Sequence, residues 1–176
     1  MGTKVSYKHH KEEAEKIHVN ICLLITSDSI VKGMKKDEIT PLFKQLISKV
    51  KGIELRSTKV VPNDPGLIAK TLSAFLNSAF CDSVIVTGGT GISRRDVSVD
   101  VVKELCSKEL PGYGELLRYL TYIKHGTIAI ASRAIACVSH DKLIFTTPGS
   151  PDAFKLAVSE LILPEIKHLI YMLRYH

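Results

Sequence analysis

Hydrophobic positions divide the chain into alternating strand-like and helix-like segments. Residues 17–25 form an almost continuous apolar run, which is typical of a strand buried on both faces of a sheet. Residues 42–50 then place apolar side chains at helical spacing, and residues 53–61 alternate as a strand does. A second helical stripe over 67–80 and a short strand over 83–86 complete a βαβαβ order. This order predicts a parallel sheet flanked by helices.

Capping residues followed by proline predict where three helices begin. These pairs are Thr40-Pro41, Asp64-Pro65 and Ser150-Pro151. Another strand is predicted over 143–147, and Pro164 is expected to break or kink the long helix that follows it. We therefore predict an α/β fold, a three-layer αβα sandwich with a mostly parallel sheet.

Length and composition indicate one globular domain. The 176 residues match the usual size of about 100 to 200 residues per domain, and 45% hydrophobic with 24% charged residues excludes a disordered or collagen-like chain. Residues 1–15, charged and non-periodic, are expected to form a mobile arm before a domain over 16–176. The longest stretches without Asp, Glu, Lys or Arg span 11 residues, fewer than the roughly 18 of a spanning helix. With no secretory signal pattern, we expect a cytoplasmic protein without membrane association.

The net charge of +6 favours an acidic partner but does not identify one. Basic residues are spread along the chain without interleaved aromatic residues, so no nucleic-acid partner is expected. The four cysteines stand 25 to 59 residues apart without a C-x-x-C pair, and we expect reduced core thiols. The seven histidines lack the spacing of metal ligands, which argues against a zinc enzyme.

The segment 87–96, between a predicted strand and a helix, carries the most chemical information. Its glycines allow positive φ and close backbone approach, so that N–H groups and hydroxyls could surround an anion or a pterin. The groups concerned belong to Thr87, Gly88, Gly89, Thr90 and Gly91. It is not a Walker loop, and Arg94 replaces the third glycine of G-x-G-x-x-G. The alternative is a tight strand-to-helix turn in which Asp96 caps the helix.

Charged and hydroxyl side chains accompany this loop at the predicted sheet edge. Arg94 and Arg95 could neutralise phosphate charge while Asp96 holds a divalent cation, or all three could be a solvated charge cluster. Ser27 and Asp28 end the first strand, although such residues also simply form turns. Pro148, Gly149 and Ser150 could form a further anion-binding site, or they could simply cap the start of a helix. Loops 26–38, 62–64, 87–96 and 147–150 should converge on one cleft, because they follow carboxyl ends of parallel strands.

Four motifs, in this order and spacing, resemble one protein family. They are residues 87–97, residues 111–118, Ser132-Arg133-Ala134 and Pro148-Gly149-Ser150-Pro151. The chain resembles the molybdenum-cofactor biosynthesis proteins of the MoaB/MogA type, which are related to domains in gephyrin. The resemblance extends from about Ile17 to the C-terminal helix, and residues 111–116 are more similar to the MoaB branch.

The resemblance implies a molybdopterin-binding domain with adenylyltransferase activity. Such an enzyme converts Mg-ATP and molybdopterin into adenylylated molybdopterin and pyrophosphate. Asp96 would be the essential carboxylate and the ligand of Mg²⁺, and Asp64 and Asn63 would complete the catalytic set. The pocket would be lined by Ser27, Asp28, Thr87, Gly88, Gly89, Thr90, Gly91, Arg95, Pro148, Gly149 and Ser150. A homotrimer or homohexamer, and other molybdenum cofactor assembly proteins as partners, are also implied.

The chain departs from the family pattern at three places. The acidic pair of Val-Pro-Asp-Asp-Pro becomes Asn63-Asp64, and an amide carbonyl binds a metal more weakly than a carboxylate. The usual Asp-x-Ser-Gly is here Asp37-Glu38-Ile39-Thr40, and Cys137 replaces a glycine. These changes leave an alternative open, a catalytically inactive pterin-binding or scaffold protein of the same fold.

Overall fold

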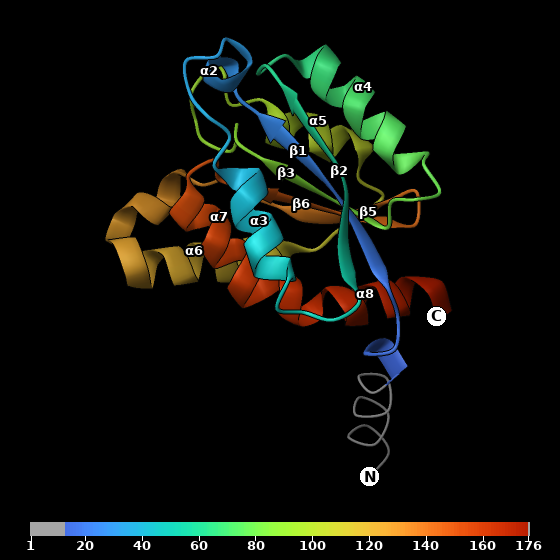
Figure 1. The fold of residues 1–176 in the computed structure, drawn as a ribbon. Helices are drawn as coiled ribbons and strands as arrows, with labels where there is room; N and C mark the ends of the chain where they lie inside the picture. The colour runs from blue at the N-terminus through green and yellow to red at the C-terminus, as the bar shows by residue number, and fades with distance from the viewer. Residues whose placement is uncertain (1–12, 176) are drawn as a thin grey trace.

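A six-stranded sheet with helices on both faces forms the centre of the protein (Figure 1). The structure is a computed structural model that describes residues 13–175. The strands are β1 (Val19–Thr26), β2 (Ile53–Val61), β3 (Ser83–Thr87), β4 (Lys108–Glu109), β5 (Ala136–Ser139) and β6 (Lys142–Thr147). They lie in the order β2-β1-β3-β6-β5-β4. The first four are parallel, and β5 pairs antiparallel with both β6 and β4. The predicted mostly parallel αβα sandwich is confirmed.

The helices cover both faces of this sheet. They are α2 (Asp28–Val31), α3 (Ile39–Ile47), α4 (Pro65–Leu76), α5 (Ser98–Leu105), α6 (Pro111–His125), the 3₁₀ helix η1 (Gly126–Ala131), α7 (Pro151–Ala157), the π-helical turn η2 (Val158–Ile162) and α8 (Leu163–Tyr175). Helices α4 and α5 pack on one face, and α3, α6, α7 and α8 pack on the other (Figure 1). Within residues 13–175, every helix is too short or too polar to cross a membrane.

The order of the strands creates a crevice at the carboxyl ends of β1 and β3. The chain leaves β1 through α3 to reach β2 on one side, then returns through α4 to β3 on the other side of β1. Connections that diverge from neighbouring parallel strands leave a gap at the sheet edge, where ligands bind in open α/β sheets. The segments that follow β1 and β3 contain Ser27, Asp28 and residues 88–96 of the predicted site, and further predicted residues follow β2 and β6.

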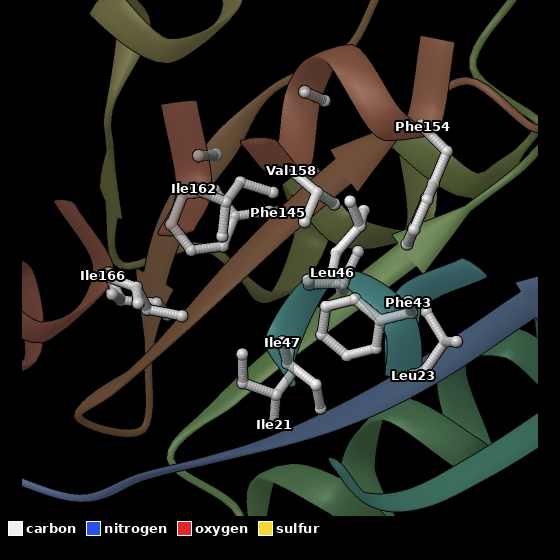
Figure 2. Packing of buried hydrophobic residues seen from close by; sticks show 14 of the residues in the cluster. Ile21, Leu23, Phe43, Leu46, Ile47, Phe145, Phe154, Val158, Ile162 and Ile166 are labelled. Carbon is white, nitrogen blue, oxygen red and sulfur yellow. The ribbon is translucent and has the colours of Figure 1, made fainter. Parts of the chain in front are cut away.

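The larger core cluster holds α3 and α7 against the sheet (Figure 2). Phe43 of α3 and Phe154 of α7 are both fully buried, and their rings meet edge to face with centroids 5.8 Å apart. Aromatic pairs in this arrangement add to the stabilisation from burial. Because Phe154 lies in the first turn of α7, this packing also places the turn at 148–150 over the sheet edge.

Two of the three predicted helix caps are confirmed. The side chains of Asp64 and Ser150 accept hydrogen bonds from the first turns of α4 and α7. The prediction for Thr40 is wrong, because α3 already begins at Ile39. The carboxylate of Asp37 accepts hydrogen bonds from the N–H groups of Ile39 and Thr40, each at 2.9 Å, and so satisfies the start of the helix earlier.

The expected interruption near Pro164 is a widened turn rather than a break. Pro164 has no N–H group to donate to the carbonyl one turn earlier, and its ring would crowd that carbonyl. The backbone forms the π-helical turn η2 immediately before α8. The C-terminal helix therefore continues past the proline.

The first described residues pack against α8. Ala14 is buried, and the Lys167 ammonium group donates to the Glu15 carbonyl oxygen at 2.9 Å and lies 3.3 Å from the Glu15 carboxylate. This contact balances the charge of a lysine that is only 7% exposed. The expected mobile arm over 1–15 otherwise falls on residues 1–12, which lie outside the described residues.

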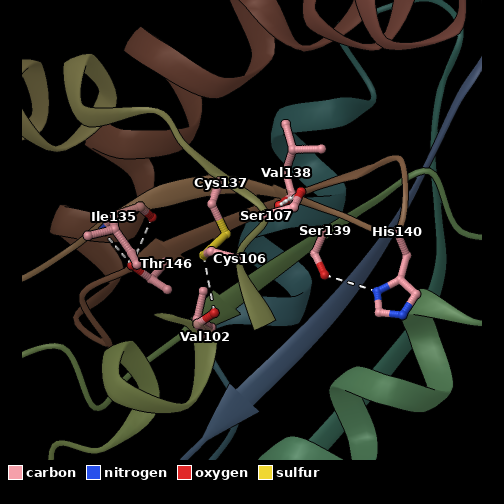
Figure 3. The surroundings of a disulfide bond; sticks show 9 residues. All are labelled: Val102, Cys106, Ser107, Ile135, Cys137, Val138, Ser139, His140 and Thr146. Carbon is pink, nitrogen blue, oxygen red and sulfur yellow. Dashed lines mark hydrogen bonds between the residues drawn. A yellow bond between two sulfur atoms is a disulfide. The ribbon is translucent and has the colours of Figure 1, made fainter. Parts of the chain in front are cut away.

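A disulfide joins Cys106, at the end of α5, to Cys137 in β5 (Figure 3). The prediction of reduced thiols is wrong for this pair, because α5 and β5 bring the two Cα atoms within 5.7 Å of each other. Cys22 and Cys81 are buried and free, as predicted. Their mutual contact and burial raise the pKa of Cys22, which keeps that thiol protonated.

Reduction of this disulfide is expected to lower the free energy of unfolding by about 3 to 4 kcal/mol, because a link across 31 residues restricts the unfolded chain. Denaturant unfolding with and without dithiothreitol measures the difference. The double variant Cys106→Ala, Cys137→Ala is the control and should not respond to the reductant. Equal stability of the wild type under both conditions would contradict the prediction.

Candidate functional site

Two adjoining cavities lie at the carboxyl edge of the sheet. The main cavity, of about 670 Å³, is lined by residues that include Gly89, Thr90, Gly91, Asp96, Ser132, Pro148, Gly149 and Ser150. The side cavity, of about 130 Å³, is lined by residues that include Thr26, Ser27, Ser29, Lys35, Lys36 and Thr87. Gly149 and Pro151 line both cavities, so the turn before α7 separates them. The predicted convergence on one cleft is confirmed only in part: loops 87–96 and 147–150 line the main cavity, loop 26–38 lines only the side cavity, and loop 62–64 lines neither.

The glycines at the start of the loop after β3 are required by its geometry. Gly88 has φ +97°, and a Cβ atom there would lie 2.4 Å from the carbonyl oxygen of Thr26. Gly89 has φ +63°, and its Cβ atom would lie 2.4 Å from the Ser98 hydroxyl oxygen. Side chains rarely adopt such φ values, and no Cβ atom fits these gaps. The loop therefore runs close against β1 and α5.

Fewer groups of this loop are free to bind an anion than the sequence predicted. The N–H group of Gly88 donates to the Thr147 carbonyl oxygen at 3.0 Å, and the Thr87 hydroxyl donates to the Pro148 carbonyl oxygen at 3.1 Å. Both groups are consequently occupied. The N–H groups of residues 89–91 make no hydrogen bond to any of residues 13–175. Three backbone donors at the main cavity therefore stay available to a ligand.

Asp96 lines the main cavity and does not cap a helix. Helix α5 begins at Ser98, and its N-cap residue is Val97. Oδ2 of Asp96 accepts a hydrogen bond from the N–H group of Ser93 at 2.8 Å, which closes a turn inside the loop. Oδ1 has no hydrogen-bond partner among residues 13–175. The helix-cap alternative is wrong, and one carboxylate oxygen is available at the cavity.

Asp28, Asn63 and Arg95 form a polar cluster beside the cavities. Oδ1 of Asp28 accepts from the Asn63 N–H group at 3.1 Å, and Oδ2 accepts from Asn63 Nδ2 at 3.4 Å and from Arg95 Nη1 at 3.3 Å. The hydrogen bond from the Asn63 backbone is the main cause that lowers the pKa of Asp28, and Arg95 adds to it. Oδ1 of Asn63 is buried without a partner in the described residues. These three residues line neither cavity.

The remaining predicted site residues serve mainly as helix caps. Asp64 is exposed at the start of α4, where Oδ1 accepts from the Leu67 N–H group at 2.8 Å, and it lines neither cavity. Ser27 caps α2 and lines the side cavity, whereas Ser150 caps α7 and lines the main cavity. The resemblance implied one catalytic set of Asp64, Asn63 and Asp96, but only Asp96 lines a cavity.

The donor groups at the main cavity suit a magnesium ion that arrives with phosphates. Within residues 13–175, no three His, Cys, Asp or Glu side chains are arranged to hold a metal ion. Mg²⁺ commonly takes only one or two protein carboxylates, together with waters and substrate phosphates. Asp96 offers one free carboxylate oxygen to such an ion, and this fits the predicted role of Asp96.

One wall of the main cavity was not predicted. It comes from the end of α6 and from η1, and comprises Thr121, His125, Ile128, Ala129 and Ala131. The family motif over 111–118 ends before this wall, and helical periodicity does not show which face of α6 borders a cavity. The structure thus adds the apolar side chains of Ile128, Ala129 and Ala131 to the cavity that holds the backbone donors.

Comparison with known proteins identifies related sequences and structures. A family described as "Probable molybdopterin binding domain" matches residues 22–168. The chain is similar to molybdenum cofactor biosynthesis protein B of Staphylococcus epidermidis, 39% identical over 171 residues that cover 93% of this chain and 96% of that protein. A crystal structure of a molybdenum cofactor biosynthesis protein B has a TM-score of 0.84 and 33% identity over 90% of this chain and 98% of that one. The tungsten cofactor synthesizing protein MoaB from Pyrococcus furiosus has a TM-score of 0.80 and 30% identity over 89% and 98%.

Proposed function

Because the chain belongs to the molybdopterin-binding domain family, we propose that it is a molybdopterin adenylyltransferase of molybdenum cofactor biosynthesis. It transfers AMP from Mg-ATP to molybdopterin and releases pyrophosphate. The observation that carries the proposal is the main cavity, where the free oxygen of Asp96 and the free N–H groups of residues 89–91 share one space of about 670 Å³. Cavities of this size accommodate small organic ligands.

Adenylyl transfer needs positioning and charge neutralisation rather than a covalent nucleophile. A phosphate oxygen of molybdopterin attacks the α-phosphorus of ATP, and the bond from that phosphorus to the bridging oxygen breaks, so that pyrophosphate leaves with the bonding electrons. The N–H groups of residues 89–91 orient phosphate oxygens, and the free oxygen of Asp96 would hold Mg²⁺. When bound, Mg²⁺ supplies positive charge to the phosphates. Lys36 adds positive charge at the same edge, whereas the charges of Lys35 and Arg95 are balanced by Glu38 and Asp28.

The apolar wall from η1 supports the assignment of the pterin to the main cavity. Ile128, Ala129 and Ala131 face the same space as Pro148. Ligand sites combine apolar contact for ring systems with a few polar groups that set orientation. The backbone donors would therefore take the phosphate end of molybdopterin and the apolar wall its rings.

The proposal is tested by incubating the purified protein with molybdopterin, Mg-ATP and a pyrophosphate detector. We expect pyrophosphate only when the pterin, ATP and Mg²⁺ are all present. A reaction without molybdopterin is the control for ATP hydrolysis. Molybdopterin binding without any pyrophosphate would contradict the transferase assignment.

Asn63 favours a second candidate function, a catalytically inactive pterin-binding or scaffold protein. If the protein is inactive because position 63 lacks a carboxylate, Asn63→Asp is expected to restore turnover, whereas Asn63→Ala should stay inactive. The new carboxylate would face Asp28, whose oxygen lies 3.4 Å from Asn63 Nδ2, so a modest loss of stability should accompany it. Pyrophosphate release by the three proteins, measured at equal molybdopterin occupancy, distinguishes an active wild type from a repaired scaffold.

Self-association forms part of the proposed function. Large apolar side chains, each more than half exposed, gather on α6 and η1: Leu116, Tyr119, Tyr122, Ile123, Ile128 and Ile130. Exposed apolar groups of this kind commonly mark protein interfaces. We propose a homotrimer or homohexamer, working in the cytoplasm with other molybdenum cofactor assembly proteins. Light scattering tests it against the 19.4 kDa mass of one chain.

A further inference from the structure

Arg133 contacts the backbone of the loop after β3 at two separate points. Its backbone N–H group donates to the Thr90 carbonyl oxygen at 2.9 Å, and its side-chain Nε donates to the Gly91 carbonyl oxygen at 2.7 Å. Nη2 makes a close contact with the carbonyl oxygen of Asp96. One residue therefore holds the part of the loop with the free N–H groups and the part with the cavity carboxylate.

Asp100 orients the guanidinium group of Arg133. Its two carboxylate oxygens lie 2.7 Å from Nη1 and 3.0 Å from Nη2 of Arg133, in the paired arrangement that fits a planar guanidinium. The hydrogen bond from Arg133 lowers the pKa of Asp100, and Asp100 in turn raises the pKa of Arg133, so both groups stay charged near neutral pH. All three side-chain nitrogens of Arg133 bind protein atoms.

The segment that carries Arg133 is anchored to α5 a second time. Four residues after Arg133, the Cys106–Cys137 disulfide ties the start of β5 to the end of α5 (Figure 3). Asp100 lies in the first turn of the same helix. The Arg133–Asp100 ion pair and the Cys106–Cys137 disulfide thus join the same two segments, α5 and the chain from Arg133 into β5. These two links hold the backbone of Arg133 in place.

We propose that Arg133 is a positioning residue of the site, which holds Asp96 and the N–H groups of residues 89–91 in place through backbone carbonyls without itself touching substrate. The proposal rests on the proposed function of the main cavity. Arg133 does not line that cavity, whereas its neighbour Ser132 does. Only arginine can bind the two carbonyl groups and the Asp100 carboxylate with one side chain, because lysine ends in a single nitrogen, whereas the backbone bond to Thr90 does not depend on the side chain.

The competing interpretation is an ion pair that only stabilises the fold. The side chains of Arg133 and Asp100 are 36% and 56% exposed, and ion pairs with such access to water contribute little to stability. A stabilising pair would therefore leave both the loop and turnover nearly unchanged when it is removed. A positioning residue would change the loop and turnover much more than stability.

The first test measures amide hydrogen exchange in the loop, which does not depend on activity. The N–H groups of Gly88, Asp96 and Ser98 are hydrogen-bonded to backbone carbonyls and report on loop opening. We expect their exchange to be at least about tenfold faster in Arg133→Ala than in the wild type, with Arg133→Lys close to Arg133→Ala. The matched control is Arg174→Ala, which removes an arginine paired with Asp82 at the opposite end of the sheet and should leave these rates unchanged.

The second test measures pyrophosphate release. Arg133→Ala should lower kcat about 100-fold, the loss expected when a reacting group is misplaced by about 1 Å, and added guanidinium should restore part of it. Adding Asp96→Asn to Arg133→Ala should cost far less than Asp96→Asn costs the wild type, because the two residues act as one unit. Arg174→Ala should keep wild-type kcat.

Unchanged loop exchange in a folded Arg133→Ala would overturn the proposal, as would fully additive losses with Asp96→Asn. If Arg133→Ala does not fold, Asp100→Asn is tested instead, because it keeps Arg133 but removes the paired carboxylate that orients its guanidinium group. Unchanged amide exchange in the loop of Asp100→Asn would also overturn the proposal. If the wild type releases no pyrophosphate, the proposed function fails on its own. The exchange rates, together with molybdopterin affinity, then still decide whether Arg133 holds the loop.

Discussion

Asp96→Asn is expected to lower turnover at least about 100-fold while leaving molybdopterin binding nearly intact. The asparagine oxygen can still accept the hydrogen bond from the Ser93 N–H group, which Asp96 accepts at 2.8 Å, so the turn inside the loop persists. The free N–H groups of residues 89–91 are unaffected by the change. What is lost is the negative charge toward Mg²⁺, and this charge matters for the reaction more than for pterin binding.

Steady-state pyrophosphate release and the Kd for molybdopterin measure the two effects separately. Asp141→Asn is the matched control, because the same chemical change is made in the β5–β6 turn, at the other end of the sheet. Asp141 has φ +55°, a backbone conformation that asparagine also tolerates. Wild-type turnover of Asp96→Asn would eliminate the catalytic role. If Asp96→Asn weakens molybdopterin binding by the same factor as turnover, Asp96 instead holds the loop in place or binds the pterin.

Gly88→Ala is expected to destabilise the protein by about 2 to 4 kcal/mol and to abolish molybdopterin binding. Gly88 has φ +97°, and the new methyl group would lie 2.4 Å from the Thr26 carbonyl oxygen and 2.8 Å from the Thr26 hydroxyl oxygen. The nearest atom is backbone at the end of a central strand, so it cannot move aside as a flexible side chain could. The loop must shift away from β1, and the N–H groups of residues 89–91 must shift with it.

Gly33→Ala separates backbone strain from the collision. Gly33 also has positive φ, +70°, but a Cβ atom there would meet nothing within 4 Å. We expect a cost of about 1 kcal/mol from the backbone conformation alone, with molybdopterin binding unchanged. Denaturant unfolding and a binding titration of both variants provide the comparison. Equal losses for the two variants would show that close approach to Thr26 is unimportant.

Local sequence pattern was sufficient for the elements that hold the site. The apolar run over 17–25 corresponds to β1, and the alternation over 53–61 coincides with β2. Asp64 and Ser150 begin their helices as predicted. These features depend on the side-chain chemistry of adjacent residues, so they can be predicted without knowing what the segment packs against.

The assignment of hydrogen bonds at the site required the structure. The sequence offered Asp96 both as a helix cap and as a metal ligand, and it counted Gly88 among the free anion donors. In the fold, Asp96 caps a turn inside its own loop, and Gly88 donates to Thr147. At the start of α3, Asp37 takes the role predicted for Thr40. Each of these groups has several chemically reasonable partners, and the backbone path selects one.

Contacts between distant segments were decided by tertiary structure alone. Spacing along the chain argued against a bridge between Cys106 and Cys137, yet packing of α5 beside β5 brings them together. Arg133 lies beside Asp100 through the same packing, and the parallel pairing of β1 with β2 brings Asn63 beside Asp28. The sequence by itself thus determined the four parallel strands, two helix starts and the glycine loop, but not the short strands β4 and β5. The cysteine pairing, the carboxylate left free for a ligand and the residue that holds the loop depended on distances between segments, because local periodicity carries no information about them.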